Sequence, residues 1–276
     1  MKPIVAVAAL AVALLVPAEA AQIGQDPAAL PVDLELVLAV DASRSIDAEE
    51  AALQRAGYIE AISHPDFVRA IKTGVNGRIA LAYFEWAGQV RQDTIVPWQV
   101  IDSQESAAAF AAMIRGGRRD ALRGTSISGA LIFGAGLISA APYAEQRRVI
   151  DVSGDGPNNL GSPVLEARDT ALASGIVING LPLLIRPSPT YRQLDRYYAD
   201  CVIGGPGSFM LPVYDMQEFA VAIRRKLILE VSGETPDEPR VIPAADGEGE
   251  NGPTDCLKGE RDRRLFSDPY FPELDK

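Results

Sequence analysis

The chain is poor in histidine, cysteine and positive charge. Its 276 residues include one histidine, His64, and 26 Lys and Arg stand against 37 Asp and Glu, giving a net charge of −11. A Ser-His-Asp triad would depend on His64, which precedes Pro65, and no G-x-S-x-G motif is present. We expect His64 to be a surface or capping residue. The acidic balance disfavours nucleic acid and anionic membranes as partners, since both need a basic face.

The two cysteines, Cys201 and Cys256, lack a CxxC spacing and partnering histidines, so they make a poor zinc site. In an oxidising compartment they would form a disulfide that ties the C-terminal tail back to the domain. Two unpaired thiols are the alternative interpretation.

Only the N-terminus carries a long apolar run. Lys2 is followed by an almost continuously apolar stretch over 3–17 and by an A-x-A cleavage signal at 18–20. This pattern predicts a signal peptide over residues 1–20, because the apolar run is short for a membrane span of about 20 residues. We therefore expect a periplasmic or secreted protein, with no stable membrane insertion after signal cleavage.

The remaining chain divides by composition into an extended leader (21–32), one domain (33–231) and a tail (232–276). The tail is rich in Pro and Gly and holds twelve acidic against six basic residues, a composition that disfavours a packed core. Strands are expected at about 33–41, 78–84, 89–97, 148–153, 176–185 and 209–213, and helices at about 47–62, 103–115, 126–140, 162–174, 190–199 and 215–231. This alternation predicts an α/β fold of three layers, with a mostly parallel central sheet, helices on both faces and one antiparallel edge hairpin.

Oxygen-bearing side chains gather where the predicted strands end. The first strand reads LVLAVDASRS and ends in Asp41, with Ser43 and Ser45 at alternate positions; Thr125 lies in a loop before a helix, and Asp155 follows a later strand. Ligands bind at the carboxyl ends of strands in open α/β sheets. Six hard oxygens in octahedral geometry suit Mg²⁺, so this edge is a candidate metal site.

The pattern Asp41-x-Ser43-x-Ser45, with Thr125 and Asp155 in the same element order, resembles the metal-ion-dependent adhesion site of von Willebrand factor A domains, in an exported bacterial branch of that superfamily. The resemblance implies a von Willebrand factor A or Rossmann-like fold, with the three hydroxyls coordinating Mg²⁺ (or Mn²⁺ or Ca²⁺) directly and the two carboxylates nearer the second shell. It also implies a protein or peptide partner whose acidic residue completes the metal shell, without catalysis.

Simpler interpretations of these residues remain open. Asp41 and Ser43 are residue types that cap helices, Thr125 and Ser126 could likewise form an N-cap, and Asp155 followed by glycine could form a turn. A metal that only stabilises the fold is a further alternative.

An enzyme interpretation rests on the run GDGPNN, which resembles the late motif of haloacid dehalogenase-like phosphatases, with Asp41 as the phosphorylated nucleophile and Asp155 in the late motif. Ser43 stands where a second Asp is needed, and no lysine occurs between Lys72 and Lys226. The phosphate-binding lysine of that family is therefore missing from its expected place.

Two further features are left with alternatives. Glu85-Trp86 could anchor a partner or could pack within the domain. The arginines at 118, 119 and 123 could steer an acidic partner towards the metal or could belong to a solvated loop.

Overall fold

The computed structural model describes residues 29–43, 46, 48–115, 124–145, 147–186, 191–234 and 253–266. The predicted signal peptide, most of the predicted leader, Ser45 and the three arginines of the basic loop lie outside the described residues.

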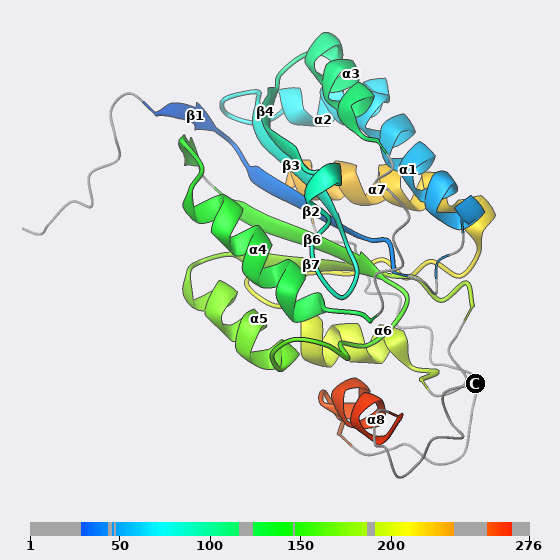
Figure 1. Ribbon diagram of the computed structural model, residues 1–276. Coiled ribbons are helices and arrows are strands. Elements are labelled where there is room, and N and C mark those ends of the chain that lie inside the picture. Colours follow the sequence, from blue (N-terminus) through cyan, green and yellow to red (C-terminus); the bar gives the residue numbers. More distant parts are fainter. Residues whose placement is uncertain are drawn as a thin grey trace, which may run out of the picture.

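A five-stranded sheet forms the centre of the molecule (Figure 1). Its order is β4-β3-β2-β6-β7, comprising β2 (Glu35–Asp41), β3 (Ile79–Trp86), β4 (Val96–Ile101), β6 (Arg148–Gly154) and β7 (Val177–Pro182). Every neighbouring pair is parallel except β3 and β4 at the edge. The predicted mostly parallel sheet with an antiparallel edge is therefore confirmed.

Helices cover both faces of this sheet (Figure 1). One face carries α1 (Ala48–Ser63), α2 (Pro65–Lys72), α3 (Gln104–Met113) and α7 (Phe219–Ser232), and the other carries α4 (Ile127–Ser139), α5 (Val164–Ala173) and α6 (Leu194–Tyr197). The side chains of β2 alternate between two cores: Leu36 and Leu38 pack on the first face, Val37 and Ala39 on the second. This period of two explains the continuous apolar run of a strand buried on both faces.

Two strand predictions are wrong in detail. The strand expected at 89–97 begins only at Val96, after a 3₁₀ turn (Gln92–Thr94), because the Thr94 hydroxyl takes the Glu85 N–H that a strand partner would have bonded. At 209–213 the chain makes only isolated bridges, from Met210 and Val213 to the β7 edge. The elements that were not predicted include α2, the C-terminal helix α8 (Lys258–Phe266), and the parallel pair β1 (Leu30–Val32) with β5 (Tyr143–Glu145).

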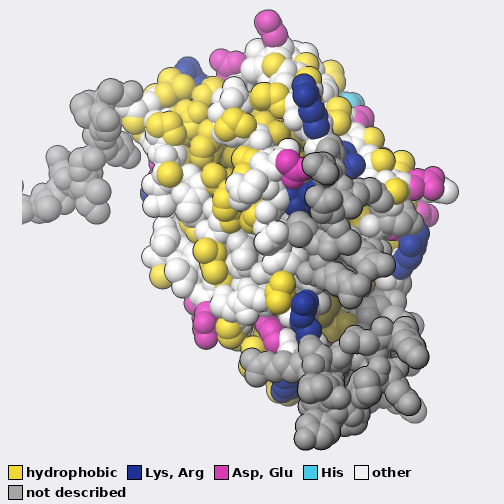
Figure 2. All heavy atoms as spheres, in the orientation of Figure 1, with side chains coloured by type: hydrophobic (Ala, Val, Ile, Leu, Met, Phe, Trp, Pro, Cys, Tyr) yellow, Lys and Arg dark blue, Asp and Glu magenta, His cyan; other side chains and the backbone are white. Residues whose placement is uncertain are grey.

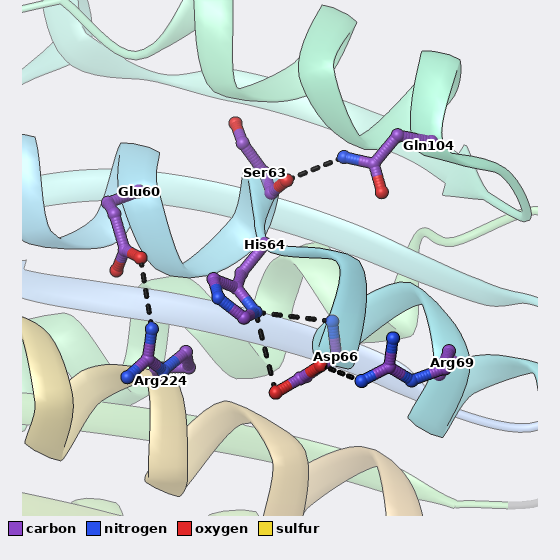
Figure 3. A network of polar contacts seen from close by, with 7 residues as sticks. All are labelled: Glu60, Ser63, His64, Asp66, Arg69, Gln104 and Arg224. Atoms are coloured by element: carbon purple, nitrogen blue, oxygen red, sulfur yellow. Dashed lines mark hydrogen bonds and ion pairs between the residues drawn. The ribbon is translucent and has the colours of Figure 1, made fainter.

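His64 directly follows α1, which ends at Ser63, and caps α2, as expected. Its Nδ1 accepts a hydrogen bond from the backbone N–H of Asp66 at 3.2 Å, and Pro65 occupies the first turn. Figure 3 shows this cap among surface contacts, including a hydrogen bond from Arg224 to Glu60. These contacts give His64 a local structural role at the helix junction.

The C-terminal tail returns to the domain. Cys201 and Cys256 form a disulfide with a Cα–Cα distance of 5.6 Å, and α8 (Lys258–Phe266) follows directly. Figure 1 shows α8 next to α6 and apart from α7, the helix that precedes the tail in the sequence.

The described surface agrees with the acidic composition. On the face seen in Figure 2, Lys and Arg side chains stand singly and do not gather into one basic patch. Within the described residues, no helix is long and apolar enough to cross a membrane.

Candidate metal centre

Asp41 is the last residue of β2 and lies at the centre of the candidate site. Its side chain is buried, with 1% of the residue exposed. Oδ1 accepts a hydrogen bond from the backbone N–H of Ser43 at 2.7 Å, and Oδ2 accepts one from that of Asp155 at 3.4 Å. The carboxylate therefore orders two loops, its own and the one after β6.

Close approach of the two loops depends on Gly154, the last residue of β6. A Cβ at this position would lie 3.1 Å from Asp41 Oδ2 and 2.7 Å from the Tyr198 hydroxyl. Burial, followed by the nearby Asp155 carboxylate, raises the pKa of Asp41 well above its usual range. Two carboxylates so placed favour the binding of a cation.

Thr125 is joined to the Asp155 loop through backbone contacts. Its N–H donates to Asn159 Oδ1 at 2.8 Å, and its carbonyl accepts from the N–H groups of Asn159 and Leu160 at 2.9 and 3.2 Å. Ser126 is the residue that caps α4, since its hydroxyl accepts from the N–H of Gly129 at 3.2 Å. The capping alternative therefore holds for Ser126 and not for Thr125.

Asn158 holds several segments together through hydrogen bonds, a role that the sequence analysis did not predict. Its Oδ1 accepts from the Ser128 N–H at 3.0 Å, its Nδ2 donates to the Ser162 carbonyl at 3.1 Å and to Glu260 Oε1 at 2.7 Å, and its N–H donates to the Tyr197 hydroxyl at 3.2 Å. The consecutive asparagines after the Asp155 turn were the available signal, because buried Asn side chains commonly fix loops.

The geometry brings four of the five predicted residues to one edge of the sheet: Asp41, Ser43, Thr125 and Asp155. Thr125 Oγ1 lies near this loop, 3.9 Å from where a Gly156 Cβ would stand. Ser45, the fifth, lies outside the described residues.

The donor set fits a small hard cation. Within the described part of the chain, no three His, Cys, Asp or Glu side chains gather to hold a metal by themselves. An ion at this edge would therefore bind to hydroxyls together with the two carboxylates. Such an all-oxygen set matches Mg²⁺ and similar hard ions.

Glu85-Trp86 belongs to the interior. Trp86 is fully buried and pairs with Asp41 across β2 and β3, and Glu85 forms a 2.5 Å ion pair with Arg55 and accepts from the Tyr83 hydroxyl at 3.2 Å. Of the two interpretations, the packing role is correct and the exposed anchor is wrong.

Lys226, the first lysine after Lys72, lies elsewhere. Its Nζ is 3.0 Å from Asp151 and 2.6 Å from Glu230, and it is almost fully buried. It is thus engaged away from Asp41, and the phosphatase interpretation gains no phosphate-binding lysine from it.

Comparison with known proteins identifies the family. Residues 31–235 match the model of the family described as "Protein of unknown function (DUF1194)". The chain belongs to this family. No curated protein sequence matches it.

Solved structures resemble this DUF1194 chain in fold. Proximal thread matrix protein 1 from the mussel byssus is 12% identical, with a TM-score of 0.54, over 74% of this chain and 49% of that one. The pilus adhesin SpaC from Lactobacillus rhamnosus GG is 13% identical, with a TM-score of 0.53, over 74% of this chain and 31% of that one. A von Willebrand factor type A structure from Catenulispora acidiphila is 18% identical, with a TM-score of 0.49, over 73% and 43%.

The mussel protein and the adhesin, both with TM-scores above 0.5, share the fold of this chain. The predicted von Willebrand factor A or Rossmann-like fold is confirmed at the level of the fold. The chain spans about half the length of the mussel protein and less of the adhesin. One structure of the mussel protein is described as having a zinc-occupied MIDAS motif, at 13% identity and a TM-score of 0.53 over 74% of this chain and 49% of that one.

Proposed function

We propose that this protein is an exported module that binds a protein or peptide partner through a divalent metal, without catalysis. The observation that carries the proposal is the convergence of Asp41, Ser43, Thr125 and Asp155 at the carboxyl edge of the sheet, where Thr125 is not used as a helix cap. The similar fold of a pilus adhesin and of a thread matrix protein with a zinc-occupied MIDAS motif supports it.

The proposed metal is Mg²⁺, with Mn²⁺ or Ca²⁺ as alternatives. The hydroxyls of Ser43, Ser45 and Thr125 would hold it, and Asp41 and Asp155 would supply negative charge from close by. With few direct carboxylate ligands, the ion retains affinity for one more anionic oxygen. An acidic side chain of the partner would supply that oxygen.

The chain's own residues prepare this arrangement. The bond from the Ser43 N–H fixes the Asp41 carboxylate, and the bonds between Thr125 and Asn159 hold the threonine loop against the Asp155 loop. Because these loops are bonded to one another, little conformational freedom is lost when an ion binds. Preorganisation of this kind favours tight and selective binding.

The experiment is isothermal titration of the mature, chelator-stripped protein with Mg²⁺ and with Mn²⁺, beside Asp41→Ala. Asp169→Ala is the matched control, since Asp169 is an exposed carboxylate on α5. We expect binding by wild type and control and none by Asp41→Ala. Equal binding by Asp41→Ala would refute the assignment.

A second step separates a binding module from a domain with a stabilising metal. The loaded protein is immobilised and incubated with peptides that carry one exposed Asp or Glu, and with the matching Asn or Gln peptides. The proposal expects capture of acidic peptides only, with release by chelator. A metal-dependent melting temperature without capture would favour the stabilising-metal alternative.

A further inference from the structure

The C-terminal helix α8 lies outside the part of the chain that matches the family, yet it contacts the candidate metal loops. The family match ends at residue 235, whereas α8 begins at Lys258. Its described residues reach the two asparagines that follow Asp155.

The first contact joins α8 to Asn158. Glu260 Oε1 accepts a hydrogen bond from Asn158 Nδ2 at 2.7 Å. Gly259 packs on the same residue, because a Cβ at this glycine would overlap the Asn158 carbonyl oxygen. The helix therefore approaches the loop backbone as closely as a glycine allows.

The second contact joins α8 to Thr125 through one shared atom. Arg263 Nη1 donates to Asn159 Oδ1 at 3.3 Å, and the same oxygen accepts the Thr125 N–H at 2.8 Å. The arginine thus helps to fix the amide that holds a proposed metal ligand.

The disulfide keeps α8 at this position. Cys256 precedes the helix by two residues and is bonded to the buried Cys201. The Tyr197 hydroxyl accepts from the Asn158 N–H at 3.2 Å and donates to the Cys256 carbonyl at 3.5 Å, which links the tether to the same loop. A nine-residue polar helix is marginal by itself, and the disulfide two residues before it limits how far it can move from the Asn158 loop.

We propose that α8 is a positioning element of the metal centre: Glu260, Gly259 and Arg263 hold Asn158 and Asn159, which in turn hold the Asp155 and Thr125 loops. Ion affinity thereby depends on the Cys201–Cys256 disulfide. This inference rests on the proposed function.

The first test titrates Mg²⁺ and Mn²⁺ into Glu260→Ala, Glu260→Gln and Asp262→Ala. Loss of an outer partner typically weakens metal binding tenfold or more, so we expect Glu260→Ala to bind about tenfold more weakly. Glu260→Gln should bind as wild type, since its amide oxygen still accepts from Asn158. Asp262→Ala is the control, because it removes a negative charge from the same helix. Among the described residues Asp262 pairs only with Lys258, at 3.7 Å, so this variant should also bind as wild type.

The second test uses Gly259→Ala and the double variant Cys201→Ser, Cys256→Ser. Both should weaken ion binding in the same direction as Glu260→Ala, while the melting temperature of Glu260→Ala and Gly259→Ala in chelator stays close to wild type. Weaker ion binding with an unchanged melting temperature would distinguish a positioning role from general destabilisation.

The outcomes distinguish this inference from the function on which it rests. If wild type binds the ions and Glu260→Ala and Gly259→Ala bind equally well, α8 does not position the site and the inference fails alone. If Glu260→Gln is as weak as Glu260→Ala, the hydrogen bond to Asn158 is not the cause and the inference is again overturned. If wild type binds neither ion, the proposed function fails, and the inference fails with it.

Discussion

Two buried carboxylates of the same sheet, Asp151 and Asp41, differ in their charged neighbours. In the interior, Asp151 on β6 and Glu230 on α7 share Lys226, which lies 3.0 Å from the first and 2.6 Å from the second. At the carboxyl edge, Asp41 faces Asp155, and no cationic partner of Asp41 is found among the described residues.

We interpret this difference as one between a structural cluster and the proposed binding site. The buried lysine is held by two carboxylates and by the Phe209 ring at 4.5 Å, so the chain neutralises this cluster internally. Even so, burial raises the pKa of Asp151 to about 7. Asp41 instead combines burial with the like charge of the neighbouring Asp155, a repulsion that the proposed cation would relieve.

The largest expected effect comes from removing the internal cation. Lys226→Met leaves Asp151 and Glu230 buried without it, and we expect a loss of about 3–5 kcal/mol in unfolding free energy. Urea denaturation in chelator at neutral pH measures this loss. The double variant Asp151→Asn, Lys226→Met should recover part of the stability, since it removes one uncompensated charge. A single variant as stable as wild type would mean that the interior cluster is not held by its ion pairs.

The edge should respond in the opposite way. Mg²⁺ at about 100 times its dissociation constant should raise the unfolding free energy of wild type by about 2.7 kcal/mol. Asp41→Asn should abolish that gain. In chelator its stability should change little, because relief of the repulsion from Asp155 offsets the loss of the long 3.4 Å hydrogen bond from the Asp155 N–H. Thermal melts with and without Mg²⁺ check both statements. If Asp41→Asn were destabilised in chelator and Mg²⁺ still raised its unfolding free energy, Asp41 would not differ from the interior cluster around Asp151.

A third buried carboxylate, Glu35 at the start of β2, tests the role of burial by itself. Burial, with a further contribution from Glu145, raises its pKa from 4.5 to about 7, while Arg148 acts in the opposite direction. The folded protein therefore keeps a proton that the unfolded chain loses above pH 4.5, so stability falls as pH rises between these values. At about 1.4 kcal/mol per pH unit, Glu35→Gln should gain about 2 kcal/mol on wild type between pH 5.5 and 7.

Urea denaturation of wild type and Glu35→Gln at these two pH values measures the change. Glu145→Gln is the companion variant, and it should reduce the pH dependence without abolishing it, because burial is the larger cause. The same difference between Glu35→Gln and wild type at both pH values would contradict a raised pKa.

The central sheet and the candidate metal residues at the carboxyl ends of its strands could be predicted from the sequence, because both depend on local patterns. An apolar run that ends in Asp41, a capped helix after Thr125 and a turn at Asp155 define strand ends without any tertiary information. The contacts of Asn158 could not be predicted in this way. They join a loop to α4 and to α8, which lies 102 residues further along the chain, at Glu260.

The errors have the same origin. Val90 fits an edge strand by pattern, yet Thr94 captures the Glu85 N–H through its side chain, which delays β4 until Val96. Side chains that bond to backbone compete with strand pairing. Three-residue strands such as β1 and β5 give too little periodicity for a pattern to detect.

The smallest effect concerns His64, whose contacts show what a purely capping residue should do. His64→Ala removes the acceptor for the Asp66 N–H and should cost about 0.5–1 kcal/mol, whereas His64→Asn should keep most of the cap. Neither variant should change the affinity for Mg²⁺, measured by calorimetry. If Asp41→Asn matched His64→Ala, with a small loss in chelator and unchanged ion binding, then Asp41 would also be only a local structural residue. Loss of ion binding in Asp41→Asn alone would establish that the Asp41 carboxylate serves a ligand in addition to its backbone contacts.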